Sequence, residues 1–210
     1  MKTESQARKV YQVLRRKILT NELLSGTRLK EDHWASQTGV SRIAVREALT
    51  RLFGEGIVKS GEKGGYFVTE LSPADIHEIK ELREIIEIGA LRLAFKKMSR
   101  SNLDTLEKIC NDFSSMVADG YYAGACEADI KFHETLVSFS ANQKLIRTYQ
   151  FSHIPLFHQH LTRNLQPPDD YNLTDKEHRA LVKALREKNL ALAEKILIQH
   201  FERGEFLVLK

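Results

Sequence analysis

The sequence predicts a mainly α-helical chain, with a winged helix-turn-helix domain at the N-terminus and an all-α helical bundle behind it. Residues 29–69 carry a helix, turn, helix pattern, followed by two short β-rich segments with glycines between them. From residue 75 onward, apolar residues recur at helical spacing and no segment is typical of a strand. A chain of 210 residues is long enough for two domains with separate cores. We therefore expect domains at 1–70 and 75–210, joined by a linker at 71–74.

The N-terminal domain begins with a predicted helix over 5–24, which supports the helix-turn-helix that follows. Gly39 supplies the positive φ that a tight turn between two steeply crossed helices requires, and Ser41 can cap the second of them. Arg42 and Arg46 are one turn apart on that helix, so both project from one face near its start. A recognition helix meets base edges and phosphates at this place. The pattern therefore predicts that Ser41, Arg42 and Arg46 contact DNA.

The β-rich segments 57–60 and 66–69 predict a hairpin, because a Gly-rich turn separates them. Beside a helix-turn-helix, such a hairpin forms a wing. Lys63 and Gly64 lie at its tip, where they are available to a phosphate or to the minor groove. Residues 1–70 hold 13 basic and 8 acidic side chains, whereas the rest of the chain holds 19 and 20. The basic excess thus belongs to the winged domain, although charge alone does not separate a DNA-binding surface from a solvated one.

This region closely resembles the DNA-binding domain of the GntR family of bacterial transcription regulators. The resemblance rests on a Gly-x-x-Leu-x-Glu segment, a Gly-Val-Ser-Arg-x-x-Val-Arg-Glu-Ala-Leu run and a Gly-tipped wing. The sequence departs from the pattern at Trp34, where Leu is usual, and at Ala44, where Pro or Thr is usual. Both residues are compatible with a helix and with an apolar core. The two departures therefore concern which DNA half-site is preferred rather than whether DNA is bound. The matching residues are Gly26, Leu29, Glu31, Ala35, Gly39, Val40, Ser41, Arg42, Val45, Arg46, Glu47, Ala48, Leu49 and Gly56.

Composition restricts the class of protein further. With 42% apolar and 29% charged residues, the chain has an ordinary globular composition, and it contains no apolar run of about 18 residues that could span a membrane. The polar start does not resemble a signal peptide, so we expect the chain in the cytoplasm. Cys110 and Cys126 have no Cys-x-x-Cys spacing, which argues against a disulfide framework or a zinc knuckle.

Capping signals indicate where the helices of the second domain begin. Ser72, Pro73 and Asp75 form a start that resembles a capping box, and Thr174 with Glu177 predicts another. The predicted helices span 75–98, 102–118, 122–140, 143–164, 175–187 and 190–208, with a kink or division at Pro155.

Four side chains of this domain could bind one metal ion. Asp129 and His133 are four residues apart on one predicted helix, so they share a face with Cβ atoms about 5–6 Å apart. His178 and His200 are each eleven residues from Asn189, which we place in the turn between the last two helices. An antiparallel hairpin of equal rise puts these two imidazoles at the same height. The alternative is an ordinary i,i+4 ion pair and three unrelated surface or core histidines.

The same residues resemble the metal-binding subset of the FCD effector domain, which is found in the FadR branch of GntR regulators. That subset carries Asp-x-x-x-His on one helix and single histidines on two later ones, and Asp129, His133, His178 and His200 match each place. Three histidines and one carboxylate suit zinc, nickel, iron or manganese rather than calcium. Such a site can be closed and tetrahedral or can keep an open position. The resemblance favours the open form, in which the ion helps to hold an organic acid.

Arg83 matches an arginine in the first helix of that effector domain and could clamp a carboxylate effector through two parallel hydrogen bonds. The alternative is an ion pair between Arg83 and Glu87 on a solvated helix face. The remaining histidines are expected to be structural or exposed, and they are His33, His77, His153, His158 and His160.

Taken together, the patterns and resemblances predict a DNA-binding transcription regulator, specifically a repressor, whose helical domain binds a divalent transition metal and a small carboxylate effector. We expect a homodimer on double-stranded operator DNA, because two-fold symmetry matches a palindromic operator. Two alternatives stay open. The helical domain could be a metal-dependent hydrolase or lyase fused to a DNA-binding module, although no phosphate loop or activated nucleophile is apparent. The metal could also be purely structural.

Overall fold

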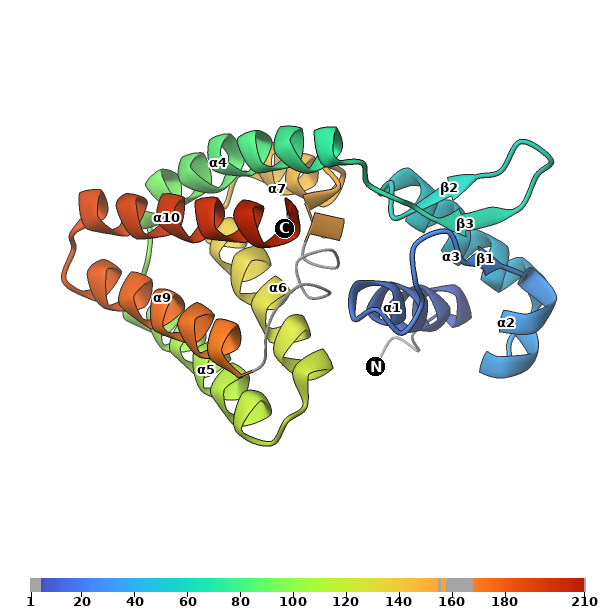
Figure 1. Ribbon diagram of the computed structural model, residues 1–210, viewed down its shortest axis with the longest axis horizontal. Helices are drawn as coiled ribbons and strands as arrows, with labels where there is room; N and C mark the ends of the chain where they lie inside the picture. Colours follow the sequence, from blue (N-terminus) through green and yellow to red (C-terminus); the bar gives the residue numbers. More distant parts are fainter. Residues whose placement is uncertain (1–4, 155, 158–167, 210) are drawn as a thin grey trace.

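The computed structural model describes residues 5–154, 156–157 and 168–209, which form two domains (Figure 1). The N-terminal domain combines helices α1 to α3 with a three-stranded sheet, and the second domain is built from helices α4 to α10. This mainly α architecture confirms the fold class predicted from the sequence. Among the described residues, no helix is both long enough and apolar enough to cross a membrane.

The N-terminal domain is a winged helix-turn-helix. Its elements are α1 (Gln6–Leu19), β1 (Arg28–Leu29), α2 (Glu31–Thr38), α3 (Arg42–Gly54), β2 (Val58–Ser60) and β3 (Tyr66–Val68). Gly39 ends α2 with a φ of 67°, the left-handed conformation that the tight turn requires. The Ser41 hydroxyl accepts a hydrogen bond from the Ala44 amide and caps α3. The buried residues of α3 are Ala44, Val45, Ala48, Leu49 and Leu52.

The strands β2 and β3 form the predicted wing, and β1 adds a third strand to it. All neighbouring strands are antiparallel, in the order β1-β3-β2, so Phe67 lies between Arg28 and Lys59. Sequence analysis missed β1, because a strand of two residues carries no periodic signal. The loop between β2 and β3 projects away from the helical domain (Figure 1).

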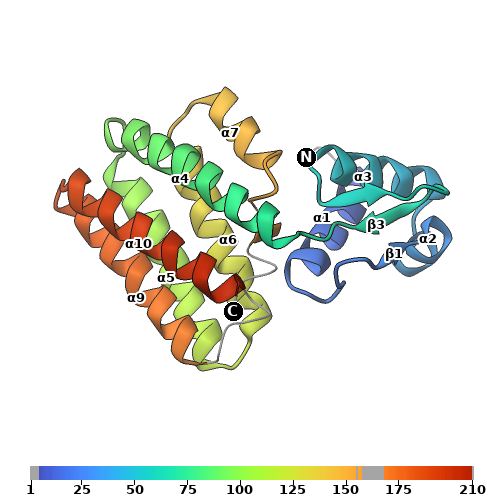
Figure 2. The same cartoon turned by 45° about the horizontal axis from the view of Figure 1, so that its top comes forward.

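The helical domain contains α4 (Pro73–Phe95), α5 (Arg100–Ala118), α6 (Tyr122–Ser138), α7 (Gln143–Gln150), α9 (Asp169–Arg186) and α10 (Leu190–Leu209). The predicted capping box at the start of α4 is present. The Asp75 amide donates to the Ser72 hydroxyl, and the Ser72 amide donates to the Asp75 carboxylate. Helix α4 packs against α6 and α10, and α9 packs against α5 and α10 (Figure 2). Their apolar faces meet in one core around Phe113 and Phe132.

Two predicted helices are shorter in the structure. Helix α1 ends at Leu19 rather than at residue 24, and Asn21 just beyond it has a left-handed φ of 61° that stops the helix. Helix α7 ends at Gln150, well within the long helix predicted over 143–164. The predicted kink at Pro155 lies outside the described residues.

The capping box predicted at Thr174 and Glu177 was wrong. Helix α9 already begins at Asp169, so Thr174 lies inside it and its hydroxyl donates to the Asp170 carbonyl one turn back. The Glu177 carboxylate instead accepts a hydrogen bond from His200 on α10. A tertiary contact therefore explains the residue that was interpreted as a local capping signal.

The two domains contact each other, with α1 of the first facing α6 of the second (Figures 1 and 2). Ile130 of α6 and Leu156 are both buried in the apolar cluster of the N-terminal domain. The ring of His153 lies against Gly56, where an added Cβ would be only 1.8 Å from Nε2. His153 itself has a left-handed φ of 59°. These contacts extend the hydrophobic core of the winged domain into the helical domain.

Candidate metal centre and DNA-binding surface

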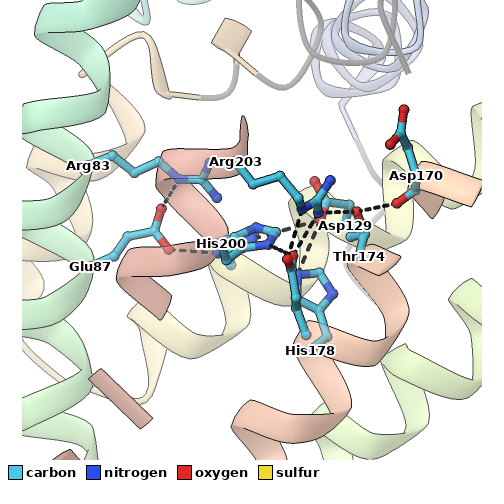
Figure 3. Close-up of polar contacts among 10 residues, drawn as sticks. Arg83, Glu87, Asp129, Asp170, Thr174, His178, His200 and Arg203 are labelled. Carbon is cyan, nitrogen blue, oxygen red and sulfur yellow. Dashed lines mark hydrogen bonds and ion pairs between the residues drawn. The ribbon is translucent and has the colours of Figure 1, made fainter. Parts of the chain in front are cut away.

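Four side chains converge inside the helical domain, from three helices that are distant in sequence (Figure 3). Helix α6 supplies Asp129 and His133, α9 supplies His178 and α10 supplies His200. Each offers one ligand atom, and these atoms all lie within 4.8 Å of one another. All four residues are buried, with His133 completely so. The structure therefore brings together all four residues that the sequence predicts as candidate metal ligands.

Asp129 lies between two of the imidazoles. Its Oδ1 is 3.8 Å from Nε2 of His133 and 3.4 Å from Nε2 of His178. The ring centroids of the three histidines are 5.0 to 5.2 Å apart. The His178 ring also stacks on Phe132, with centroids 4.1 Å apart and planes 8° from parallel. Donor atoms about 2.0–2.2 Å from one ion are about 3–4 Å from each other, so this spacing fits ligands that share an ion.

Two further carboxylates accept hydrogen bonds from histidine rings of the cluster. Nδ1 of His133 donates to Glu87 at 2.7 Å, and Nδ1 of His200 donates to Glu177 at 2.7 Å. In both rings Nε2 is then the nitrogen that a metal ion would bind, as in the carboxylate, histidine and metal arrangement of many metal sites, and Nε2 of His133 lies 3.8 Å from Asp129. Sequence analysis did not assign this role. From the sequence, Glu87 is predicted only as a partner of Arg83, and Glu177 only as a capping residue.

Arg83 contacts Glu87, which in turn contacts His133. Its Nε donates to Glu87 at 2.6 Å, and its guanidinium is 4.4 Å from the centre of the Phe201 ring. The ion pair with Glu87 is therefore present, but it is buried, because Arg83 is only 1% exposed. Nη2 of Arg83 is also buried and makes no hydrogen bond to the described residues.

Burial controls the protonation of His133 and His178. It lowers the pKa of His178 to about 3 and holds the pKa of His133 well below its usual range. Burial acts to raise the pKa of Glu177, but hydrogen bonds from His200 and Arg203 outweigh it and lower that pKa to about 2. His133 and His178 are thus neutral at pH 7, the form that binds a metal.

The other histidines lie away from this cluster. His77 is an exposed residue of α4 that pairs with Glu205 at 2.6 Å. His33 is exposed on α2, and His153 packs between the two domains. His158 and His160 lie outside the described residues.

A second polar surface lies on the recognition helix. Arg42 and Arg46 project from α3 with side chains 60% and 61% exposed. Arg46 donates two hydrogen bonds to Glu31, at 2.9 and 2.8 Å, and Nε of Arg42 is 2.9 Å from Asp32. Both acidic partners belong to α2, so this helix fixes the direction of the two guanidinium groups. Sequence analysis did not foresee these pairs.

The other residues predicted to contact DNA are exposed as well. Ser41 lies at the start of α3, and Lys63 and Gly64 lie in the turn between β2 and β3. Gly64 has a left-handed φ of 81°. An exposed recognition helix, a basic wing and an adjoining helical domain with a buried polar cluster together define a class of protein, the DNA-binding transcription regulators.

Comparison with known proteins identifies the family. Residues 6–68 match the gntR family of bacterial regulatory proteins, and residues 78–203 match the FCD domain. The chain therefore belongs to the GntR family of bacterial transcription regulators, in the group that carries an FCD domain. The resemblances to the GntR DNA-binding domain and to the FCD domain are both confirmed.

Relatives and a solved structure agree with this assignment. The chain is 28% identical over 194 residues to YdhC, an uncharacterized HTH-type transcriptional regulator of Bacillus subtilis, covering 91% of this chain and 85% of that one. It is 29% identical over 198 residues to the gluconate operon transcriptional repressor of Bacillus licheniformis, covering 90% and 79%. The structure of E. coli McbR/YncC has a TM-score of 0.87 at 19% identity, over 99% of this chain and 98% of that one, which supports the fold alone. Because the family and these curated relatives are regulators, the hydrolase or lyase alternative is rejected.

Proposed function

We propose that this regulator is a homodimeric repressor whose helical domain binds one divalent transition metal ion together with a small carboxylate effector. The ligands are Asp129, His133, His178 and His200. Operator DNA is bound by α3 and the wing, through Ser41, Arg42, Arg46, Lys63 and Gly64. Binding of the effector changes the affinity of the dimer for its operator.

The observation that carries the metal proposal is the buried cluster of three imidazoles and one carboxylate. Their ligand atoms all lie within 4.8 Å of one another, and carboxylates orient two of the rings. Neutral imidazole nitrogens with one carboxylate oxygen suit zinc, nickel, iron or manganese. A shared ion would accept a lone pair from all four of these buried groups and would offset the cost of burying them. When bound, the ion supplies a positive charge inside the domain to which a carboxylate can bind.

The carboxylate class of effector is supported by Arg83. Its Nη2 is buried, makes no hydrogen bond to the described residues and belongs to the group whose Nε holds Glu87. An arginine nitrogen in such a place favours a negatively charged oxygen ligand. A purely structural metal would leave that nitrogen without a function.

The dimer and the repressor role rest on different support. A palindromic operator is contacted by two copies related by a two-fold axis, with half-sites about 34–36 Å apart for one helical turn. Repression is inferred from the relative of Bacillus licheniformis, whose name describes a repressor of the gluconate operon.

Elemental analysis of protein purified without chelators tests the metal proposal directly. We expect about one divalent ion per chain in the parent protein, and loss of that ion in Asp129→Ala and in His178→Ala. His77→Ala is the matched control, because this exposed histidine lies outside the cluster, and it should keep the ion. An ion-free parent, or full occupancy in both cluster variants, would refute the proposal.

A further inference from the structure

Helix α6 has two functional faces. Asp129 and His133 are four residues apart and face the interior of the helical domain, where they belong to the candidate metal centre. Ile130 and Glu134 are also four residues apart and face α1. Ile130 is buried in the apolar cluster of the winged domain, and the Glu134 carboxylate pairs with Arg15 of α1. One rigid helix thus touches the metal centre and the DNA-binding domain along its length.

Arg15 continues this connection toward the recognition helix. Its guanidinium pairs with Glu134, and its Nε lies 4.0 Å from Glu55. Glu55 is the residue that caps the C-terminus of α3, and it is only 7% exposed. Its carboxylate accepts hydrogen bonds from the Tyr11 hydroxyl at 2.8 and 2.9 Å and from Nε of Arg51 at 3.2 Å. A contiguous polar network therefore joins the end of the recognition helix to α6.

Neighbouring contacts keep the two domains docked around this network. Nε of Arg16 is 3.7 Å from Glu127, one further charge pair between α1 and α6. The His153 ring against Gly56 adds a tight packing contact. The side chains of Arg15 and Glu134 are 22% and 36% exposed, so solvent screens their pair only in part.

We propose that α6 couples the metal centre to DNA binding, and that the ion pair between Arg15 and Glu134 is the contact through which the coupling passes. This inference rests on the proposed function, since it assumes that the cluster binds an ion. Glu134 directly follows His133 in the same helix, so a displacement of His133 also displaces Glu134. Arg15 and Glu55 then carry that displacement to the end of α3. An ion changes DNA affinity only if it binds the two arrangements of this contact with different affinity.

The test uses the full-length chain and measures the ratio of its DNA affinity with saturating zinc to its DNA affinity with a chelator. This ratio is the coupling ratio. DNA affinity is determined at fixed salt with saturating zinc and with a chelator, on a DNA site that the parent protein selects from a random pool. Zinc affinity is measured separately for each protein. The variants are Arg15→Gln, Glu134→Gln and the double variant. Glu194→Gln is the matched control, because it removes the Arg92 pair, at 2.7 and 2.8 Å, which joins α4 to α10 within the helical domain.

In the parent we expect zinc to change DNA affinity by a factor in the range usual for allostery, about 5- to 150-fold. Each single variant should bind zinc like the parent, yet its ratio should fall toward one. The coupling ratio of the double variant should not fall below that of either single variant, because the two substitutions remove the same contact. Glu194→Gln should keep the parental ratio.

Three outcomes overturn the proposal, and they differ from failure of the proposed function. Zinc binding with a parental ratio in Glu134→Gln would show that the coupling does not pass through this pair. A ratio that falls equally in Glu194→Gln would show that any lost ion pair has the same effect. A parent that takes up neither zinc nor nickel, iron or manganese refutes the proposed function. In that case amide hydrogen exchange tests the contact between Arg15 and Glu134 by itself. If exchange in α1 is the same in Glu134→Gln as in the parent, the proposed role of this contact is refuted as well.

Discussion

Glu87 and Glu177 each accept a hydrogen bond from Nδ1 of a histidine in the cluster, at 2.7 Å in both cases. Glu87 also accepts from Arg83, and Glu177 also accepts from Arg203. Each carboxylate therefore favours the tautomer that carries a proton on Nδ1 and helps to hold the orientation of its ring. Their substitution should weaken metal binding without removing a ligand.

Glu177→Gln tests this role. The amide keeps the size of the side chain but loses the negative charge that favours an Nδ1–H donor on His200. We expect zinc affinity to fall about 10- to 100-fold, with the same stoichiometry at saturation, as measured by competition with a chromophoric chelator. Glu202→Gln is the control on the neighbouring helix, since Glu202 is exposed. Parental affinity in Glu177→Gln would mean that this hydrogen bond does not orient the ligand.

The buried histidines also predict how the ion-free protein responds to pH. Burial lowers the pKa of His178 to about 3, whereas the unfolded chain has a value near 6.5. Because the folded pKa is the lower one, stability from this group is complete above about pH 6.5 and is lost as pH falls toward 3. His178 contributes up to about 1.4 kcal/mol per pH unit to the slope of the unfolding free energy against pH.

Urea unfolding between pH 7.5 and pH 5, with a chelator present, measures this effect. The parent should lose stability on acidification, and His178→Phe should lose less, since a phenyl ring can keep the stack on Phe132 but cannot take up a proton. Equal slopes in both proteins would mean that His178 does not titrate differently on unfolding.

Among the elements, the recognition helix allows the clearest prediction. Arg46 is held by Glu31 and Arg42 by Asp32, but all of these pairs are on the surface. Removing either arginine should leave the melting temperature near that of the parent. Operator affinity should fall about tenfold to a hundredfold, because a base or phosphate contact is lost. Gel-shift titration of Arg42→Ala and Arg46→Ala at fixed salt measures the loss, and undiminished affinity would contradict the recognition role.

The elements that local signals define were predicted well from the sequence. Gly39, Ser41 and the capping box at Ser72 depend on residues within four positions of each other, so their conformations can be inferred from a short segment. The i,i+4 pair of Asp129 and His133 and the equal rise of the last two helices were also sufficient to select four side chains that converge.

What the sequence did not reveal depends on contacts between distant segments. Glu177 is adjacent to His178 in the chain, but its partner His200 lies on the next helix, and a local pattern favoured a capping role. Glu87 reaches His133 across 46 positions, and Arg15 reaches Glu134 across 119. No periodic pattern in the sequence indicates such long-range pairs. The earlier start of α9 and the two-residue strand β1 were missed for the same reason, since tertiary packing and sheet pairing decide them.

For the whole molecule, the proposed two-fold symmetry predicts a mass of twice 24.1 kDa in sedimentation equilibrium at micromolar concentration. The dimer should bind a palindromic site with steep dependence on the spacing of its half-sites, because both winged domains must meet the same face of the duplex. A single-chain mass that does not change with concentration would contradict the dimer. Equal affinity for a half-site and a full site would contradict symmetric recognition.

The contact of His153 with Gly56 has a consequence for engineering. A biosensor could be made by grafting another winged domain onto this helical domain. Here the helical domain contributes a ring that fits only against a residue without a side chain, and Gly56 also has a left-handed φ of 70°. A donor winged domain must therefore carry glycine at this position, or the recipient must exchange His153 for a small residue. The junction between the two parts is determined by this pair as well as by the linker sequence.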